Sequence, residues 1–304
     1  MLGLLLLIAA ATYLGYRLFP EPLFDLAARL QRRAAGLERR EITVDGHRVI
    51  YLEGGQGEPL LLLHGFGADK DHWSQISKHL TPHFRVIVPD LPGFGESSRL
   101  SDARYDLEQQ LTRLGQFVAG LGLARFHLGG NSMGGYLAAM YAQHAPDSVL
   151  SLWLLAPAGV GSAAPSEFLA MLARGDNLLL VDSEVTAKRL YGMLFAKAPF
   201  LPGEFRRIWR HRAMRDCEFN TKIFNELFAE PVTLESRLEG LATPAFIVWG
   251  DDDRVLDVSG AAVLKKLLPN VTIRIMPYMG HCPMLERPRN TAIDFLNYHG
   301  RALL

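Results

Sequence analysis

The sequence predicts an α/β fold in which a mostly parallel central sheet carries helices on both faces. Short apolar runs that are typical of buried strands recur along the chain: PLLLLHG, FRVIVPD, RFHLGG, LSLWLLAP, AFIVWG and VTIRIMP. Longer amphipathic stretches, such as YDLEQQLTRLGQFVAGLGL, lie between them. A chain of 304 residues, 49% of them hydrophobic, can bury one large core, and we expect one main domain.

An uncharged apolar run from Leu2 to Tyr16 opens the chain. As a helix rising ~1.5 Å per residue, it nearly spans a hydrocarbon core of ~30 Å, so residues 1–19 predict a transmembrane anchor. The alternatives are a soluble core helix and a cleaved signal peptide, for which Ala9 and Ala11 supply an A-x-A pattern. No Lys or Arg precedes the apolar run, which favours the anchor.

This anchor predicts a single-pass membrane protein, and we expect it in a bacterial inner membrane. Positive residues follow the apolar run, a pattern that favours a cytoplasmic catalytic domain, although one short span leaves the side of the membrane open. Ala11 and Gly15 form a small-xxx-small pair, through which two such helices could approach closely in a homodimer.

We predict an amphipathic juxtamembrane helix over residues 20–39, with Pro20 and Pro22 at its start. Its apolar face carries Leu23, Leu26, Ala27 and Leu30, and Arg29, Arg32 and Arg33 lie elsewhere. That pattern is typical of a helix at a lipid headgroup layer, where arginines meet anionic lipid. The alternative is a solvated linker helix that covers part of the main domain.

The globular part begins at residue 40 with a hairpin: EITV, a turn at Asp45-Gly46, then RVIYLEG. Strands and helices then alternate, and we assign 40–158 and 241–304 to the α/β core. The intervening residues 159–240 have helical periodicity without a strand-like run, which predicts an inserted helical cap. Its many large apolar residues could line an acyl-chain tunnel or merely pack the cap on the body. Its arginines between 206 and 215 could rest on anionic headgroups or form a solvated face.

Charge and metal-ligand patterns exclude two classes of partner. The 32 basic and 32 acidic residues cancel, so we expect no nucleic acid partner. Cys217 and Cys282 are too few for a disulfide framework and lack a zinc-binding spacing. His79 and His83 have the spacing of helical metal ligands, but Pro82 between them spoils the helix. We therefore expect no metal.

One serine stands in a context that predicts a nucleophile. The segment Gly130-Asn131-Ser132-Met133-Gly134 follows the strand RFHLGG and opens the helix YLAAMYAQH, which is the strand-turn-helix setting of a G-x-S-x-G motif. Glycines flank the serine because the turn is strained and crowded. Ser132 is therefore the candidate catalytic nucleophile.

A serine hydroxyl needs an imidazole to remove its proton and a carboxylate to fix the imidazole tautomer. Downstream, the strand AFIVWG ends in the run from Asp251 to Asp253, and the strand VTIRIMP is followed by His281. Both positions lie just beyond the carboxyl ends of strands, where catalytic groups gather in open α/β sheets. His281 is the predicted base, and one of the aspartates is the predicted acid.

Catalysis also needs hydrogen-bond donors for the oxyanion of a tetrahedral intermediate. The turn His64-Gly65-Phe66-Gly67 follows the strand PLLLLHG, in the position that supplies one backbone donor to enzymes with the G-x-S-x-G turn. We assign the oxyanion hole to the backbone N–H groups of Phe66 and Met133. The His64 ring is interpreted as a hydrogen-bonded structural group.

With the segments HGFGADKDHW, DLPGFGES, GNSMGG, WGDDDRVLDVSGA and GHCPMLERPRNTA, the chain closely resembles the serine hydrolases of the α/β-hydrolase superfamily. The resemblance covers the chain after about residue 40. The loop pattern W-G-x-x-D of the superfamily selects Asp253 as the acid. The last two segments and the N-terminal anchor are most similar to the group of membrane-anchored monoacylglycerol lipases and bacterial phospholipases A of the PlaF type.

That resemblance implies an α/β-hydrolase fold and hydrolysis of acyl esters of glycerolipids, without a cofactor. The expected substrates are phospholipids, lysophospholipids or monoacylglycerols, cleaved through an acyl-enzyme at a membrane bilayer. The alternative is a carboxylesterase, thioesterase or C–C bond hydrolase that acts on a smaller soluble substrate. Serine at the turn argues against the dehalogenase and epoxide-hydrolase branches, and a non-enzymatic receptor would not need a triad.

Overall fold

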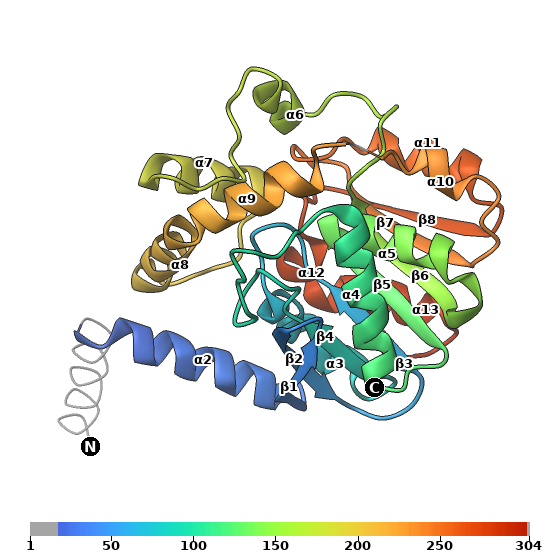
Figure 1. Ribbon diagram of the computed structural model, residues 1–304, viewed down its shortest axis with the longest axis horizontal. Coiled ribbons are helices and arrows are strands. Elements are labelled where there is room, and N and C mark those ends of the chain that lie inside the picture. The colour runs from blue at the N-terminus through green and yellow to red at the C-terminus, as the bar shows by residue number, and fades with distance from the viewer. Residues whose placement is uncertain (1–17, 231, 303–304) are drawn as a thin grey trace.

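A computed structural model describes residues 18–230 and 232–302, which form a twisted sheet flanked by helices (Figure 1). The sheet has eight strands in the order β1-β2-β4-β3-β5-β6-β7-β8. The strands are β1 (Leu37–Val44), β2 (His47–Gly54), β3 (Pro59–Leu63), β4 (Arg85–Pro89), β5 (Phe126–Ser132), β6 (Val149–Pro157), β7 (Ala245–Gly250) and β8 (Val271–Met276). The pairs β1–β2 and β2–β4 are antiparallel and all the others are parallel, which confirms the predicted mostly parallel sheet.

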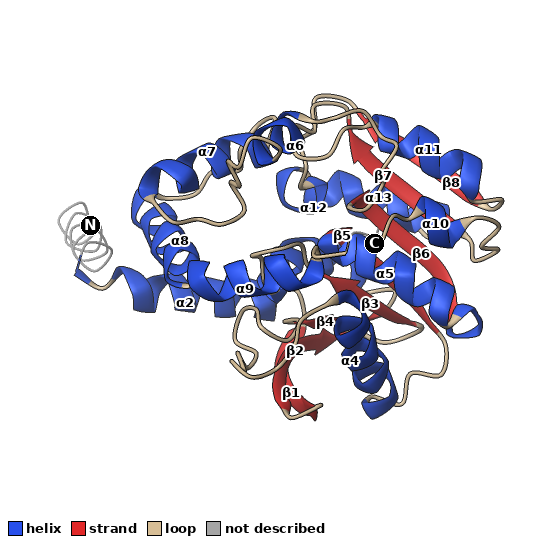
Figure 2. Ribbon diagram, turned by 45° about the horizontal axis from the view of Figure 1, so that its top comes forward, coloured by secondary structure: helices blue, strands red, loops and turns tan. Residues whose placement is uncertain are grey.

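Helices cover both faces of the sheet because successive strand residues point to opposite sides (Figure 2). Leu60 and Leu62 of β3 belong to one buried cluster, which includes α3 (Ser74–Leu80) and α13 (Pro288–Tyr298). Leu61 and Leu63 belong to the other, which includes α4 (Leu107–Gly120), α5 (Met133–His144) and α11 (Ser259–Leu267). The remaining short elements of the body are η1 (Lys70–Trp73), η2 (Pro146–Ser148) and α12 (Pro283–Glu286).

In the described residues between β6 and β7, the regular secondary structure is all helical. Its helices are α6 (Glu167–Leu172), α7 (Glu184–Leu194), α8 (Gly203–Arg215), α9 (Cys217–Leu227) and α10 (Glu235–Leu238). Large apolar side chains of α6 and α7, including Phe168, Leu190 and Met193, form a cluster with Val255 of the loop after β7. These side chains therefore join the cap to the body.

The helix α2 (Pro20–Ala34) precedes the sheet and lies beside α8 (Figure 1). The Phe24 ring contacts the Phe205 ring edge to face at 5.2 Å, and Arg212 donates to the Asp25 carboxylate at 2.9 Å. Leu26 and Leu30 of the predicted apolar face remain 47% and 55% exposed. The helix thus contacts the cap while part of its apolar face stays open to the surroundings.

Two strand expectations need correction. The first strand begins at Leu37 rather than at the EITV segment, because Leu37–Val44 pairs along its whole length with β2. The strand β8, expected to be buried, is an edge strand with partner β7 on one side, and Ile275 is 38% exposed.

The predicted transmembrane anchor lies almost entirely outside the described residues, as do Ala11 and Gly15 of the predicted helix-pairing motif. Within residues 18–230 and 232–302, no helix is long and apolar enough to cross a bilayer.

Candidate active site

Ser132 occupies a strained turn between β5 and α5. Its backbone has φ 56° and ψ −119°, a positive φ that residues other than glycine seldom adopt. The flanking glycines are required by space: a Cβ on Gly130 would lie 2.3 Å from the carbonyl carbon of Gly134, and a Cβ on Gly134 would lie 2.3 Å from the Leu63 oxygen. The turn therefore presents the serine at the carboxyl end of the central strand.

Asp253 and His281 are brought together from the loops after β7 and β8. His281 Nδ1 lies 2.8 Å from Asp253 Oδ2, and both side chains are buried. The second carboxylate oxygen, Oδ1, accepts the N–H groups of Val255 at 2.8 Å and Leu256 at 3.0 Å. With Nδ1–H donating to Asp253, Nε2 of His281 is left with a lone pair that can accept a proton.

The neighbouring aspartates of the run have different surroundings. Asp251 and Asp252 are exposed, and Asp251 Oδ1 lies 3.5 Å from the Met279 nitrogen. Neither forms a hydrogen bond to His281 in the described chain. The geometry thus distinguishes Asp253 from the two residues before it.

Asn131, which sequence reasoning did not single out, ties the serine turn to the histidine loop. Its side-chain Nδ2 donates to the carbonyl oxygens of His281 and Leu155, each at 3.0 Å. Because Asn131 directly precedes Ser132, these bonds hold the backbone of the base next to the nucleophile. Its place inside the G-x-S-x-G motif was the only sequence signal, since a buried asparagine cannot be recognised from spacing.

The turn that carries Phe66 and the first residue of α5, Met133, both adjoin Ser132. A Cβ on Gly65 would lie 3.4 Å from the Ser132 Cβ, so the turn that carries Phe66 contacts the nucleophile directly. Met133 follows Ser132 as the first residue of α5, where backbone N–H groups have no intrahelical acceptor. In the described part of the chain, neither the Phe66 nor the Met133 N–H donates to another group. Both remain available to an oxyanion.

His64 supports this turn as a neutral ring. Its Nε2 accepts the Leu91 N–H at 3.0 Å, and its Nδ1 lies 2.8 Å from the Gly65 oxygen. Burial lowers the pKa of His64 to about 4, so the ring is uncharged at neutral pH. The hydrogen bonds agree with the structural interpretation.

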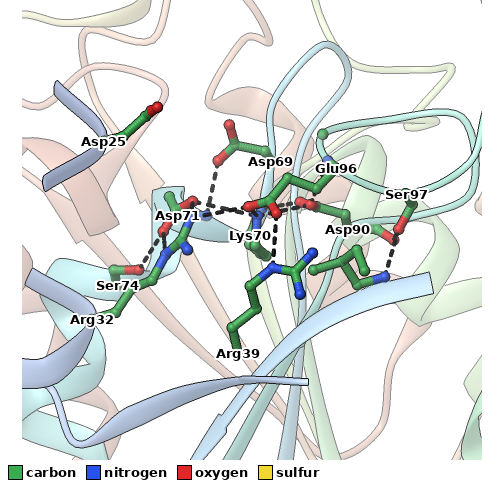
Figure 3. A network of polar contacts seen from close by, with 12 residues as sticks. Asp25, Arg32, Arg39, Asp69, Lys70, Asp71, Ser74, Asp90, Glu96 and Ser97 are labelled. Carbon is green, nitrogen blue, oxygen red and sulfur yellow. Dashed lines mark hydrogen bonds and ion pairs between the residues drawn. The ribbon is translucent and has the colours of Figure 1, made fainter. Parts of the chain in front are cut away.

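A buried ion network anchors the far end of the same turn (Figure 3). Lys70 is 1% exposed, and its Nζ lies 2.9 Å from Asp90 and 2.8 Å from Glu96. Burial opposes the charged form of Lys70, but the carboxylates, Asp90 foremost, outweigh it and raise the pKa of Lys70. Arg32 of α2 reaches the network by donating to Asp71 at 2.6 Å. The network therefore joins α2 to η1, which follows the turn that bears Phe66.

The cap arginines of the sequence prediction are largely paired with acids. Arg207 binds Glu204 at 2.8 Å and Arg210 binds Glu184 at 2.6 Å. Arg212 binds Asp25, and Arg215 binds Asp216, each at 2.9 Å. These arginines do not form a patch of uncompensated positive charge.

A cavity of about 350 Å³ lies between α7 and α8. It is lined by Ala187, Lys188, Tyr191, Gly203, Arg206, Trp209 and Arg210. It touches none of the candidate catalytic residues.

The cysteines, and the histidines with the spacing of metal ligands, are the candidates for a second nucleophile or a metal site in the described residues. Cys282 is buried beside His281, and burial raises the pKa of its thiol. Such a thiol stays protonated and is a poor nucleophile. Across residues 18–230 and 232–302, no group of three or more His, Cys, Asp or Glu side chains could hold a metal ion.

Known proteins match the chain over most of its length. It is 35% identical over 272 residues to Lipase 1 of Psychrobacter immobilis, covering 87% of this chain and 85% of that protein. It is 31% identical over 299 residues to the monoacylglycerol lipase ABHD6 of Homo sapiens, covering 93% and 89%. A crystal structure of a membrane phospholipase A, described as a bacterial virulence factor, superposes with a TM-score of 0.91 at 41% identity, covering 98% and 97%.

The family described as the alpha/beta hydrolase fold matches residues 58–288, a range that contains Ser132, Asp253 and His281. The sheet topology, the strained serine turn and the acid–base pair agree with that match. The chain belongs to the alpha/beta hydrolase fold family.

Proposed function

We propose that this protein is a carboxylic ester hydrolase that cleaves acyl esters of glycerolipids, as a lipase or phospholipase A. The observation that carries the chemistry is the Asp253–His281 pair, tied through Asn131 to a serine in a strained turn. The lipid substrate class rests on the similarity to a lipase, a monoacylglycerol lipase and a phospholipase A. Phospholipids, lysophospholipids and monoacylglycerols are the candidate substrates.

The proposed reaction assigns one role to each of these groups. Nε2 of His281 accepts the Ser132 hydroxyl proton while the oxygen attacks the ester carbonyl, and Asp253 stabilises the imidazolium that forms. The Phe66 and Met133 N–H groups donate to the resulting oxyanion. Collapse of the tetrahedral intermediate breaks the ester bond, and His281 returns the proton to the leaving alcohol. Water, deprotonated by His281, then attacks the acyl-Ser132 ester. His281 returns this proton to the Ser132 oxygen as the carboxylic acid leaves.

Membrane attachment through residues 1–19 is part of the proposal, with a single span in a bacterial inner membrane. The solved phospholipase A is described as a membrane protein. Around the start of α2, Leu18 and Phe19 are 60% and 61% exposed, and Phe200 before α8 is 92% exposed. Exposed large apolar side chains that form one contiguous patch mark surfaces that contact lipid or protein. Pairing of two anchors through Ala11 and Gly15 into a homodimer is a further element of this proposal.

The substrate test measures fatty acid release by the full-length protein from a phospholipid, a lysophospholipid and a monoacylglycerol in detergent. Ser132→Ala is the control, since it removes only the attacking oxygen. We expect release from at least one lipid by the wild type and loss of more than about 10³-fold in the variant. Hydrolysis confined to p-nitrophenyl butyrate would reject a lipid substrate and favour a soluble-ester carboxylesterase.

The anchor is tested separately by fractionation. The full-length chain should remain with membranes after carbonate extraction, whereas a chain that starts at residue 18 should be released. Recovery of the full-length chain in the soluble fraction would exclude the anchor without affecting the proposed chemistry.

A further inference from the structure

The carboxylate of Glu286 joins the cap to the loop that carries the catalytic base. Glu286 ends α12, and its Oε2 accepts the Gly280 N–H at 3.2 Å and the Ala196 N–H at 3.1 Å. Its Oε1 accepts the Lys197 N–H at 2.9 Å. Gly280 directly precedes His281, and the other two donors come directly after Phe195, the C-cap residue of α7. One side chain therefore holds together two backbone segments that are distant in sequence.

The same end of α7 also contacts the base itself. The His281 N–H donates to the Leu194 oxygen at 2.9 Å. A Cβ on Gly280 would lie 2.7 Å from both the Leu194 oxygen and the Ala196 nitrogen, so the two segments pack backbone against backbone. The side chain of Arg254, next to Asp253, donates to the carbonyl of Gly192 in α7. The loops of the acid and the base thus both rest on this one helix.

We propose that Glu286 is a positioning residue for His281 and that the carboxyl end of α7 is part of the support of the catalytic base. The proposal rests on the proposed function, because it assigns His281 the role of the base. The loops of Asp253 and His281 follow different strands, so neither loop alone sets the 2.8 Å distance between their side chains. The Glu286 bonds restrain the backbone directly before the imidazole.

Loss of the carboxylate leaves three backbone N–H groups without their acceptor, and the bond from the His281 N–H to the Leu194 oxygen then has to hold the Gly280–His281 backbone on α7 without the Glu286 bonds. The imidazole then departs from the alignment that proton transfer from Ser132 needs, and a misplacement of 1 Å can cost on the order of 10²-fold in rate. We expect substrate binding to be spared, because the partners of this carboxylate are three backbone N–H groups of the protein. The effect should fall on kcat and spare KM.

Glu235 provides a matched control at the other end of the cap. Its carboxylate accepts the N–H groups of Gly161 at 3.1 Å and Ser162 at 2.7 Å, together with the Ser162 hydroxyl at 2.7 Å. It therefore bridges two backbone segments with the same chemistry as Glu286. It forms no hydrogen bond to the loops of Asp253 or His281 in the described residues.

The experiment compares Glu286→Ala, Glu286→Gln and Glu235→Ala in the full-length protein with p-nitrophenyl butyrate as substrate. We expect kcat to fall about 50-fold in Glu286→Ala, with KM within about twofold of the wild type. Glu286→Gln should lose about 5-fold, because its amide oxygen can still accept two of the three N–H groups. Glu235→Ala should keep kcat within about twofold while its urea midpoint falls as much as that of Glu286→Ala.

A spectroscopic measurement separates positioning from general damage. The downfield proton resonance of the His281–Asp253 hydrogen bond should broaden or vanish in Glu286→Ala and persist in Glu235→Ala. An unchanged kcat in folded Glu286→Ala, or an equal loss in both alanine variants, would overturn the proposal. If Glu286→Ala does not fold, the Gln variant decides by the same criteria, a loss under twofold being the contrary result. A wild type that hydrolyses neither this ester nor any of the three lipids of the substrate test would instead reject the proposed function.

Discussion

Replacing Asp253 by Asn exchanges one oxygen for an NH₂ group and leaves the size of the side chain unchanged. In the structure Oδ1 accepts two backbone N–H groups, from Val255 and Leu256, and Oδ2 faces His281 Nδ1. The amide oxygen of Asn should take the Oδ1 position, since the opposite orientation would set its NH₂ against two donors. The NH₂ group then donates to Nδ1, which moves the imidazole proton to Nε2.

An imidazole that carries its proton on Nε2 cannot accept the proton of Ser132, and its cation has lost the adjacent negative charge. Replacement of the triad aspartate by asparagine lowers kcat about 10⁴-fold, which corresponds to about 5.5 kcal/mol of activation free energy. Initial rates with p-nitrophenyl butyrate measure it, and the urea midpoint should stay close to that of the wild type. Asp252→Asn, at an exposed neighbour, is the control and should be nearly normal. A loss under tenfold in Asp253→Asn, or a severe loss in Asp252→Asn, would refute the reasoning.

Two further predictions concern stability. Gly134→Ala should destabilise the fold by about 3 kcal/mol or more, because its Cβ would lie 2.3 Å from the Leu63 oxygen. Gly192→Ala in α7, where a Cβ meets nothing within 4 Å, should instead stabilise the fold by about 0.5–1 kcal/mol. Equal free energies of unfolding for the two variants in urea would contradict the packing argument. Burial lowers the pKa of His64 from 6.5 to about 4, so between these values the unfolded chain binds more protons than the folded chain. The contribution of neutral His64 to the free energy of unfolding is then fully present above pH 6.5, and about 3 kcal/mol of it should be lost as the pH falls to 4. A urea midpoint that does not decline over this range would count against a neutral buried His64.

Local patterns predicted the parallel part of the sheet because its strands are buried on both faces and read as continuous apolar runs. Edge strands are partly exposed, so a continuous apolar run does not predict them reliably. β8 is apolar in sequence but half exposed. β1 begins at Leu37 because all of Leu37–Val44 pairs with β2, and the sequence of β1 alone does not show this pairing. Periodicity describes one segment at a time, so it cannot report which neighbour a strand acquires.

The site was predictable to the extent that chemistry depends on residue type and chain order. Ser132, Asp253 and His281 were named from a turn motif, strand ends and a family loop pattern, and the structure places the last two 2.8 Å apart. Asn131, Lys70 and Glu286 received no functional role from the sequence. Asn131 and Lys70 bond to partners 150 and 20 residues away, and Glu286 links Gly280, six residues away, to Ala196, which is 90 residues away. No spacing rule encodes such contacts.

The paired cap arginines show the same limit. In sequence they form a run of positive charge, whereas in the structure Arg210 meets Glu184 of α7 and Arg212 meets Asp25 of α2. A count of charges along one helix omits the acids that neighbouring helices bring to it. Of the two alternatives that the sequence left open, headgroup contact and a solvated face, the first loses its electrostatic basis at these positions.

By itself the sequence determined the fold class, the strained serine turn and the order of the candidate catalytic groups, because apolar periodicity and glycine requirements act over a few residues. The family loop pattern already selected Asp253 among the three aspartates, whereas only the tertiary structure decided what holds the base in place and how the arginines are neutralised. Each of these depends on the distance between side chains from separate elements, and that distance exists only after the sheet and the cap have packed.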